Sequence, residues 1–185
     1  VDLAGAEIDL VQMPNREHIV KNRLNRVRDN YDFIVIDCPP SLGLLTVNAL
    51  TASDAIVIPI QCEFYALEGL TQLMNTIKLV KKHLNPNLDV EGVVLTMKDS
   101  RSNLINQVSN EITTFFGKKV FTTAIPRNVR LAEAPSHGVP IGAYDSSSKG
   151  AKAYLALAEE ILKRNNMEYE NATTKIKIDE GENND

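Results

Sequence analysis

The sequence predicts an α/β fold in which a parallel sheet is covered by helices on both faces. Four short apolar runs have the length and composition of buried strands; they lie at 33–37, 55–60, 90–96 and 120–125. Amphipathic helical patterns lie between and after these runs. Strands that alternate with helices indicate βαβ units, and the strands of such units run parallel.

The four strand predictions rest on composition. The first three runs are rich in Val and Ile and lack polar alternation, which is typical of strands buried on both faces. The fourth run is weaker because Thr122 and Thr123 interrupt it.

The helix predictions rest on apolar residues that recur at steps of three and four. Such stripes run through 67–84, 104–116 and 154–162. An earlier helix is predicted over 15–29, with Ile19, Val20, Leu24 and Val27 facing inward, and Pro14 suits the position just before its first turn.

The composition is that of a globular protein with one domain. The chain has 185 residues, of which 43% are hydrophobic and 24% charged. No stretch approaches the roughly 20 apolar residues of a membrane span, and the first residues do not resemble a signal peptide. Cys38 and Cys62 have neither metal-ligand spacing nor a disulfide pattern, so we expect two reduced thiols in a cytoplasmic protein.

The charge divides the chain into two parts. Residues 165–185 hold six acidic side chains and two lysines, so this segment carries the whole net charge of −4. We therefore predict a folded domain over 1–164 and an acidic, disordered tail over 165–185.

The sharpest local signal is Asp37, which ends the apolar run at 33–36 and is followed by two prolines. In open α/β sheets, ligands bind beyond the carboxyl ends of the strands. A carboxylate at that edge suits Mg²⁺, which prefers oxygen ligands and keeps several waters. The alternative for a strand-ending Asp is that it caps the next helix.

The sequence from 37 to 50 resembles the Walker B and switch II region of the ParA/Soj family, the deviant-Walker ATPases that segregate chromosomes and plasmids. Further strings in the same order also resemble this family; they lie at 2–7, 59–70, 95–104 and 124–138. The resemblance covers residues 1–164 and implies a fold like that of P-loop NTPases.

The resemblance implies a site for ATP and Mg²⁺. Asp37 matches the Walker B aspartate, a catalytic residue that holds Mg²⁺ through water, and the turn from Pro39 to Gly43 matches switch II, which senses the γ-phosphate. Two strand ends match the segments that bracket adenine; their residues are Thr96, Met97, Pro126, Arg127 and Asn128. For Met97 alone, simple packing is an equal alternative.

The resemblance also implies binding of double-stranded DNA without sequence preference, through Arg101, Arg127 and Arg130. Neutralising phosphates needs several cations on one face and no contact with base edges. The alternative is that these arginines are solvated or paired locally, and Glu133 lies three residues after Arg130.

The phosphate-binding loop of the family is not found in the sequence, which contains neither Gly-Lys-Thr nor Gly-Lys-Ser. The chain also lacks an initiator Met, so we read it as the carboxyl-terminal two thirds of such a protein, without the strand that carries the loop. We expect this part alone to be inactive, and we expect the run at 33–37 to expose an apolar edge.

The function implied for the whole protein is that of a DNA-partition ATPase. It would form a homodimer with ATP, bind DNA, be stimulated by a ParB-type partner, and associate with the nucleoid rather than a membrane. One alternative is a MinD-like membrane-associated ATPase, although the acidic tail lacks a basic amphipathic helix. Another is a non-enzymatic regulator or scaffold without the loop. The motifs do not distinguish chromosome from plasmid cargo.

Overall fold

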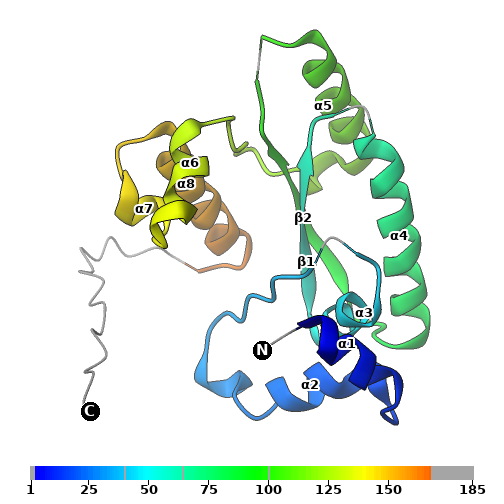
Figure 1. The fold of residues 1–185 in the computed structure, drawn as a ribbon. Coiled ribbons are helices and arrows are strands. Elements are labelled where there is room, and N and C mark those ends of the chain that lie inside the picture. The colour runs from blue at the N-terminus through cyan, green and yellow to red at the C-terminus, as the bar shows by residue number, and fades with distance from the viewer. Residues whose placement is uncertain (1–2, 40, 64, 100, 168–185) are drawn as a thin grey trace, which may run out of the picture.

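The computed structural model describes residues 3–39, 41–63, 65–99 and 101–167. Its sheet has two regular parallel strands, β1 (Ala55–Gln61) and β2 (Asp89–Thr96), joined by helix α4 (Ala66–His83). The two strands lie side by side (Figure 1), and in their register Ile58 pairs with Val93 and Ile60 with Leu95. The sequence predictions for these three elements are confirmed to within a residue or two.

The run at 120–125 lies beside β2 without forming a regular strand. Isolated parallel bridges join Val93 to Val120 and Lys98 to Pro126. Between these bridges, the backbone N–H groups of Thr122 and Thr123 donate to the carboxylate of Glu160 at 2.8 and 2.9 Å. These two amides are therefore diverted from strand pairing, which explains why the strand predicted here is interrupted.

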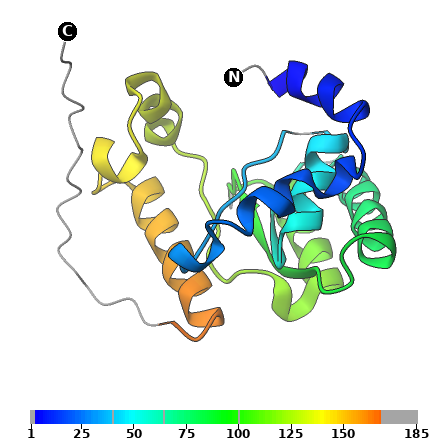
Figure 2. The same cartoon turned by 90° about the horizontal axis from the view of Figure 1, so that it is seen from below.

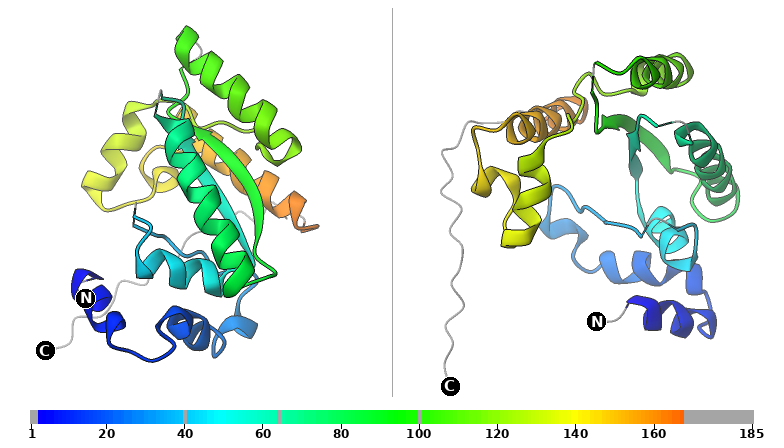
Figure 3. Two further views of the ribbon diagram at one scale, coloured as in Figure 1. Left: turned by 90° about the vertical axis from the view of Figure 1, so that its right-hand side faces the viewer. Right: turned by 45° about the horizontal axis from the view of Figure 1, so that its top comes forward.

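Helices cover both faces of the sheet, as predicted (Figures 2 and 3). On one face, Val93 and Leu95 of β2 pack in a core with α3 (Leu44–Ala52), α4 and α5 (Asn103–Phe116). On the other face, Val94 packs with Phe121, Ile125 and residues of α8 (Lys149–Arg164). Alternate residues of β2 thus face two different cores, as in a strand covered on both sides.

The apolar residues at the centres of the predicted helix stripes are buried, as predicted. In α4, Leu70, Ile77 and Val80 are buried. In α5, Val108 and Ile112 are buried, whereas the terminal Leu104 and Phe115, predicted on the same face, are exposed. The ends of this helix therefore contribute little to the core.

The helix predicted over 15–29 is broken into three pieces, which corrects that prediction. The pieces are the 3-10 turn η1 (Arg16–His18), helix α2 (Ile19–Leu24) and the 3-10 turn η2 (Arg28–Asn30). The buried side chain of Asn48 in α3 donates to Arg16 O at 2.7 Å and accepts from Val20 N at 3.2 Å. These bonds engage main-chain groups at the junction of η1 and α2. Val27, predicted to face inward, is exposed.

The run at 33–37 is not a strand, in contrast to the prediction. It belongs to an irregular segment between η2 and α3 (Figure 1). Within the described ranges, no backbone hydrogen bond joins residues 32–37 to another strand, so the segment has no partner to complete a ladder. The side chains of Phe33, Ile34 and Val35 are exposed, as we expected of an unpaired edge, and Val35 is 90% exposed.

The remaining elements are one helix near the amino terminus and several short elements in the carboxyl-terminal half. Helix α1 (Leu3–Val11) lies beside α3, and the 3-10 turn η3 (Gly117–Lys119) follows α5. Three short elements precede α8: α6 (Val129–Glu133), the 3-10 turn η4 (Ala134–His137) and α7 (Ile141–Tyr144).

Two predictions concern the ends and the membrane. Residues 165–167 form a hydrogen-bonded turn after α8, whereas residues 168–185 of the predicted tail lie outside the described residues. Among the helices in the described ranges, none is both long enough and apolar enough to cross a bilayer.

Candidate functional site

The candidate site lies at the carboxyl edge of the sheet, where β2 and its neighbour end together. Lys98 N donates to Ile125 O at 3.1 Å, and Arg127 N donates to Lys98 O at 3.3 Å. This parallel pairing brings the segment with Thr96 and Met97 beside the segment with Pro126 and Arg127.

The two segments differ in exposure and conformation. Thr96 is half-buried, whereas Met97 is 42% exposed. Met97 adopts a left-handed backbone conformation with φ 53°, which is uncommon for a residue other than glycine and turns the chain at the strand end. Because much of its side chain is exposed, packing accounts for Met97 only in part.

Asn128 is the N-cap of α6, and its side-chain oxygen accepts a hydrogen bond from Arg130 N at 2.9 Å. This bond fixes the path of the chain from Pro126 into the helix. The side chain of Asn128 thus has a structural role at this edge.

Asp37 lies in the irregular segment rather than at the end of a regular strand, and its side chain is exposed. Partial burial raises the pKa of the neighbouring Cys38 thiol, and the charge of Asp37 adds to the same shift. Within the described part of the chain, no group of three or more His, Cys, Asp or Glu side chains could hold a metal ion by itself. A single exposed carboxylate fits a Mg²⁺ ion that is shared with nucleotide phosphates and water.

The turn from Pro39 to Gly43 leads into α3, and residue 40 lies outside the described ranges. Ser41 N donates to Pro39 O at 2.7 Å, and Thr46 Oγ1 donates to Ser41 O at 2.5 Å. The turn is therefore anchored to the first turn of α3.

Glu7 is a residue of this site that the sequence analysis did not identify. Its Oε1 accepts a hydrogen bond from Leu44 N, the first residue of α3, at 2.9 Å. The available signal was the glycine before α3: Gly43 has no side chain with which to cap the helix, which leaves the first N–H groups open to an acceptor from another segment.

Arg101 is paired locally. Its Nε and Nη2 donate to the two carboxylate oxygens of Asp99 at 3.0 and 2.8 Å. This side-chain hydrogen bond is the main reason why the pKa of Asp99 is lowered to about 2, and the charge of Arg127 contributes to the same shift. The Arg101 side chain remains 89% exposed, so the pair lies in solvent and is weak.

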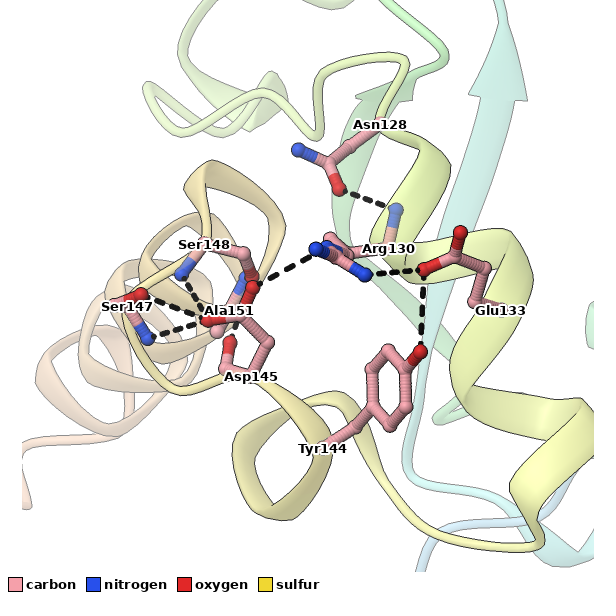
Figure 4. A network of polar contacts seen from close by, with 8 residues as sticks. All are labelled: Asn128, Arg130, Glu133, Tyr144, Asp145, Ser147, Ser148 and Ala151. Atoms are coloured by element: carbon pink, nitrogen blue, oxygen red, sulfur yellow. Dashed lines mark hydrogen bonds and ion pairs between the residues drawn. The ribbon is translucent and has the colours of Figure 1, made fainter.

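Arg130 is held by two carboxylates (Figure 4). Its Nη1 donates to Glu133 Oε2 at 2.9 Å, and its Nε lies 3.6 Å from Asp145 Oδ2. Tyr144 donates from its hydroxyl to the same oxygen of Glu133 at 3.2 Å. The hydrogen bond to Glu133 is the first cause of the raised pKa of Arg130. Glu133 was the competing partner expected from the sequence, and its ion pair with Arg130 is present.

Asp145 is fixed in turn by the loop before α8. Its Oδ1 accepts hydrogen bonds from Ser147 Oγ at 2.8 Å and from the backbone N–H groups of Ser147 and Ser148 at 3.1 Å each. The Ser147 hydroxyl is the main cause that lowers the pKa of Asp145. Asp145 therefore stays ionised beside Arg130.

The chain is similar to several known proteins. A family model described as an AAA domain matches residues 1–90. The sporulation initiation inhibitor protein Soj of Bacillus subtilis is 62% identical over 161 residues, which are 87% of this chain and 64% of that protein. The chromosome partitioning protein ParA of Myxococcus xanthus is 56% identical over 163 residues, which are 88% of this chain and 58% of that protein.

A solved structure shows the same fold. Cobyrinic acid a,c-diamide synthase from Mycobacterium smegmatis, with a bound ATP analogue and magnesium, aligns with a TM-score of 0.73 at 34% identity. The alignment covers 89% of this chain and 60% of that one. The chain thus spans less than two thirds of the length of these proteins.

Proposed function

The chain belongs to the ParA/Soj family, and we propose from that premise that it carries part of an ATP-dependent DNA-partition ATPase. The observation that carries this proposal is the pairing of Lys98 with Pro126 at the carboxyl edge of the sheet. Ligands of open α/β sheets bind at this edge, and the two segments that the family uses around adenine meet there.

In the proposed site, Thr96, Met97, Pro126, Arg127 and Asn128 bracket the adenine ring. The exposed thioether of Met97 and the ring of Pro126 offer flat apolar contacts to a base, while backbone groups bond its edge. Pro39 and Gly43 flank the turn that faces the terminal phosphate.

We assign Asp37 to the magnesium ion, which it holds through water. The bound ion would neutralise charge that develops on the transferred phosphoryl group. The role of Asp37 itself is to orient the hydration shell of the ion, because a single carboxylate cannot form a complete ligand set.

We further propose that Arg101, Arg127 and Arg130 bind DNA phosphates. All three side chains are exposed. Arg101 follows the end of β2, and Arg127 and Arg130 follow Pro126, which is bridged to Lys98 at the same edge of the sheet. Three arginines can neutralise only a few phosphates, so pairing two chains in an ATP-dependent homodimer would double this set and raise the affinity. Stimulation by a ParB-type partner and association with the nucleoid belong to the same proposal.

The test uses the protein expressed from its complete reading frame. We would measure its retention on duplex DNA of random sequence, with MgATP, with MgADP and without nucleotide, across a series of salt concentrations. The expected result is retention that needs MgATP and falls steeply as salt increases.

Two outcomes would contradict the proposal in different ways. Retention that is equal with and without ATP would remove the nucleotide switch and favour a non-enzymatic scaffold. No retention on DNA, together with ATP-dependent binding to anionic liposomes, would favour the MinD-like alternative.

A further inference from the structure

Helix α3 begins without a capping side chain of its own. Gly43 occupies the N-cap position in an extended conformation, with φ −78° and ψ −172°. The first backbone N–H groups of a helix have no partner within the helix. For Leu44, the partner is Oε1 of Glu7, which lies 37 residues earlier in the sequence, in α1, and accepts at 2.9 Å.

The approach of Glu7 to this helix start leaves no room for a side chain at position 43. A Cβ atom built on Gly43 would overlap Oε1 of Glu7 and would lie 3.2 Å from its Cδ. Gly43 and Glu7 therefore form a matched pair, in which the glycine admits the carboxylate and the carboxylate replaces the missing cap. The negative charge of Glu7 also suits the positive end of the helix.

The pair sits at the end of the turn from Pro39 to Gly43. Thr46 holds this turn from inside α3 through Ser41 O at 2.5 Å. Glu7 holds the junction from a different helix, because α1 lies beside α3 (Figure 1). The turn can therefore move as a unit only if the bond between α1 and α3 opens or α1 moves with it.

We propose that Glu7 is a positioning residue for this turn, and that it couples α1 to the turn's response to the terminal phosphate of the nucleotide. This inference rests on the proposed function, which assigns the turn to the γ-phosphate. A carboxylate cannot itself bind phosphate, because both groups are negative. Its contribution is to fix the backbone of residues 43 and 44, so that the turn meets the phosphate in one orientation.

The experiment compares four single variants with the wild type, all expressed from the complete reading frame. Glu7→Ala removes the acceptor, and Glu7→Gln keeps an oxygen that can accept the bond from Leu44 N. Asp9→Ala removes an exposed carboxylate from the same helix and is the matched control. Gly43→Ala introduces the methyl group that displaces Glu7.

The readouts are the dissociation constants for a non-hydrolysable ATP analogue and for ADP, each with Mg²⁺, and the kcat and KM of ATP hydrolysis. We expect Glu7→Ala to lower the preference for the ATP analogue over ADP, and also kcat, each by about tenfold, the scale of one charge-assisted hydrogen bond. ADP affinity should change by less than about twofold, since the turn faces only the terminal phosphate, whereas the KM for ATP should rise together with the dissociation constant of the ATP analogue.

Glu7→Gln should restore most of the preference, Asp9→Ala should match the wild type, and Gly43→Ala should reproduce Glu7→Ala. The double variant Glu7→Ala/Gly43→Ala should be no worse than either single variant, because both remove the same contact. If Glu7→Ala does not fold, Glu7→Asp carries the same test, since it keeps the charge but shortens the side chain.

A folded Glu7→Ala variant that keeps the wild-type preference and kcat would overturn the inference. An equal loss of affinity for both nucleotides would also overturn it, because that pattern indicates a general structural role. A wild-type protein that binds neither nucleotide would instead overturn the proposed function, and this inference with it.

Discussion

Arg130 Nη1 donates to Glu133 Oε2 at 2.9 Å, one helical turn along α6. The same oxygen accepts the hydroxyl of Tyr144, and Asp145 lies on the other side of the guanidinium (Figure 4). Two carboxylates thus face one cation, so this cluster carries a net negative charge. A DNA phosphate that reaches Arg130 must compete with both of them, although Arg130 is 54% exposed and solvent weakens the pairs.

Replacing Arg130 should weaken DNA retention without changing the fold. We expect Arg130→Ala to reduce the slope of log affinity against log salt by about 1, the effect of losing one phosphate contact. The matched control is Arg28→Ala, because Arg28 is also an exposed arginine paired with a carboxylate, that of Asp54, just before the amino end of β1. An equal loss in both variants would show that Arg130 has no special contact with DNA.

Neutralising Glu133 should have the opposite effect. Glu133→Gln keeps an oxygen that can accept a bond from Arg130 but removes one of the two competing charges. We expect the affinity for DNA to rise a few-fold, since exposed ion pairs are worth at most about 1 kcal/mol. Retention on DNA at fixed salt measures this. A lower affinity would mean that the charge of Glu133 is needed to orient Arg130.

Glu160 should make the stability depend on pH. Burial opposes ionisation of this carboxyl, but hydrogen bonds from the backbone of Thr122 and Thr123 outweigh it, so its pKa lies below the usual range. A lowered pKa in the folded state means that the stabilisation is complete above the unfolded pKa and is lost as the pH falls through the folded one. Glu160→Ala should therefore cost about 2 kcal/mol at neutral pH and less in acid.

Urea unfolding of the wild type and the variant at neutral and at acidic pH measures this difference. Glu159→Ala is the control, because Glu159 is the exposed neighbour on the same helix. A cost that stays constant with pH would assign the effect to packing rather than to the ionised carboxylate.

Two glycines should respond to alanine with opposite signs. A methyl group at Gly92 in β2 would overlap the ring of Phe121 and would lie 2.8 Å from Lys119 O, so we expect a loss of about 1–3 kcal/mol in the free energy of unfolding. A methyl group at Gly69 in α4 meets nothing within 4 Å, so the higher helix propensity of alanine should stabilise the protein by about 0.5–1 kcal/mol. Thermal unfolding of both variants decides the signs; a stabilised Gly92→Ala would contradict the packing of β2 against Phe121.

Much of the fold follows from local pattern. The strands β1 and β2 and the helix α4 are predictable because burial on both faces and helical periodicity are properties of contiguous residues. The run at 33–37 has the same apolar character but no partner in the described ranges, and a strand exists only as part of a ladder. Likewise, Glu160 interrupts the strand at 120–125 from a helix 37 residues further along the chain.

In the candidate site, too, contacts within one element were predictable and contacts between distant segments were not. The ion pair between Arg130 and Glu133 was predictable from their spacing of three. Asp145 was not predicted as a partner, because it lies in the loop before α8 and meets Arg130 only in the folded chain. The bond from Leu44 to Glu7 was not predicted, because no local pattern shows which distant carboxylate caps a helix. Contacts between distant segments depend on the packing of elements, and a single sequence does not display them.

Asp37 should be essential for turnover but not for binding of the nucleotide itself. Asp37→Ala, in the protein expressed from its complete reading frame, should lower Mg²⁺-dependent ATP hydrolysis by about a hundredfold or more, because the hydration shell of the ion loses its anchor. Binding of the ATP analogue without Mg²⁺ should change little. Asp32→Ala is the matched control, since Asp32 is exposed in the same irregular segment and precedes the apolar run instead of ending it. Hydrolysis that survives Asp37→Ala, or that falls equally in both variants, would remove Asp37 from the metal site.

The chain of 185 residues alone should show no turnover, since it contains neither Gly-Lys-Thr nor Gly-Lys-Ser. Clean turnover from this chain, abolished by Asp37→Ala, would show that the phosphate-binding loop is dispensable.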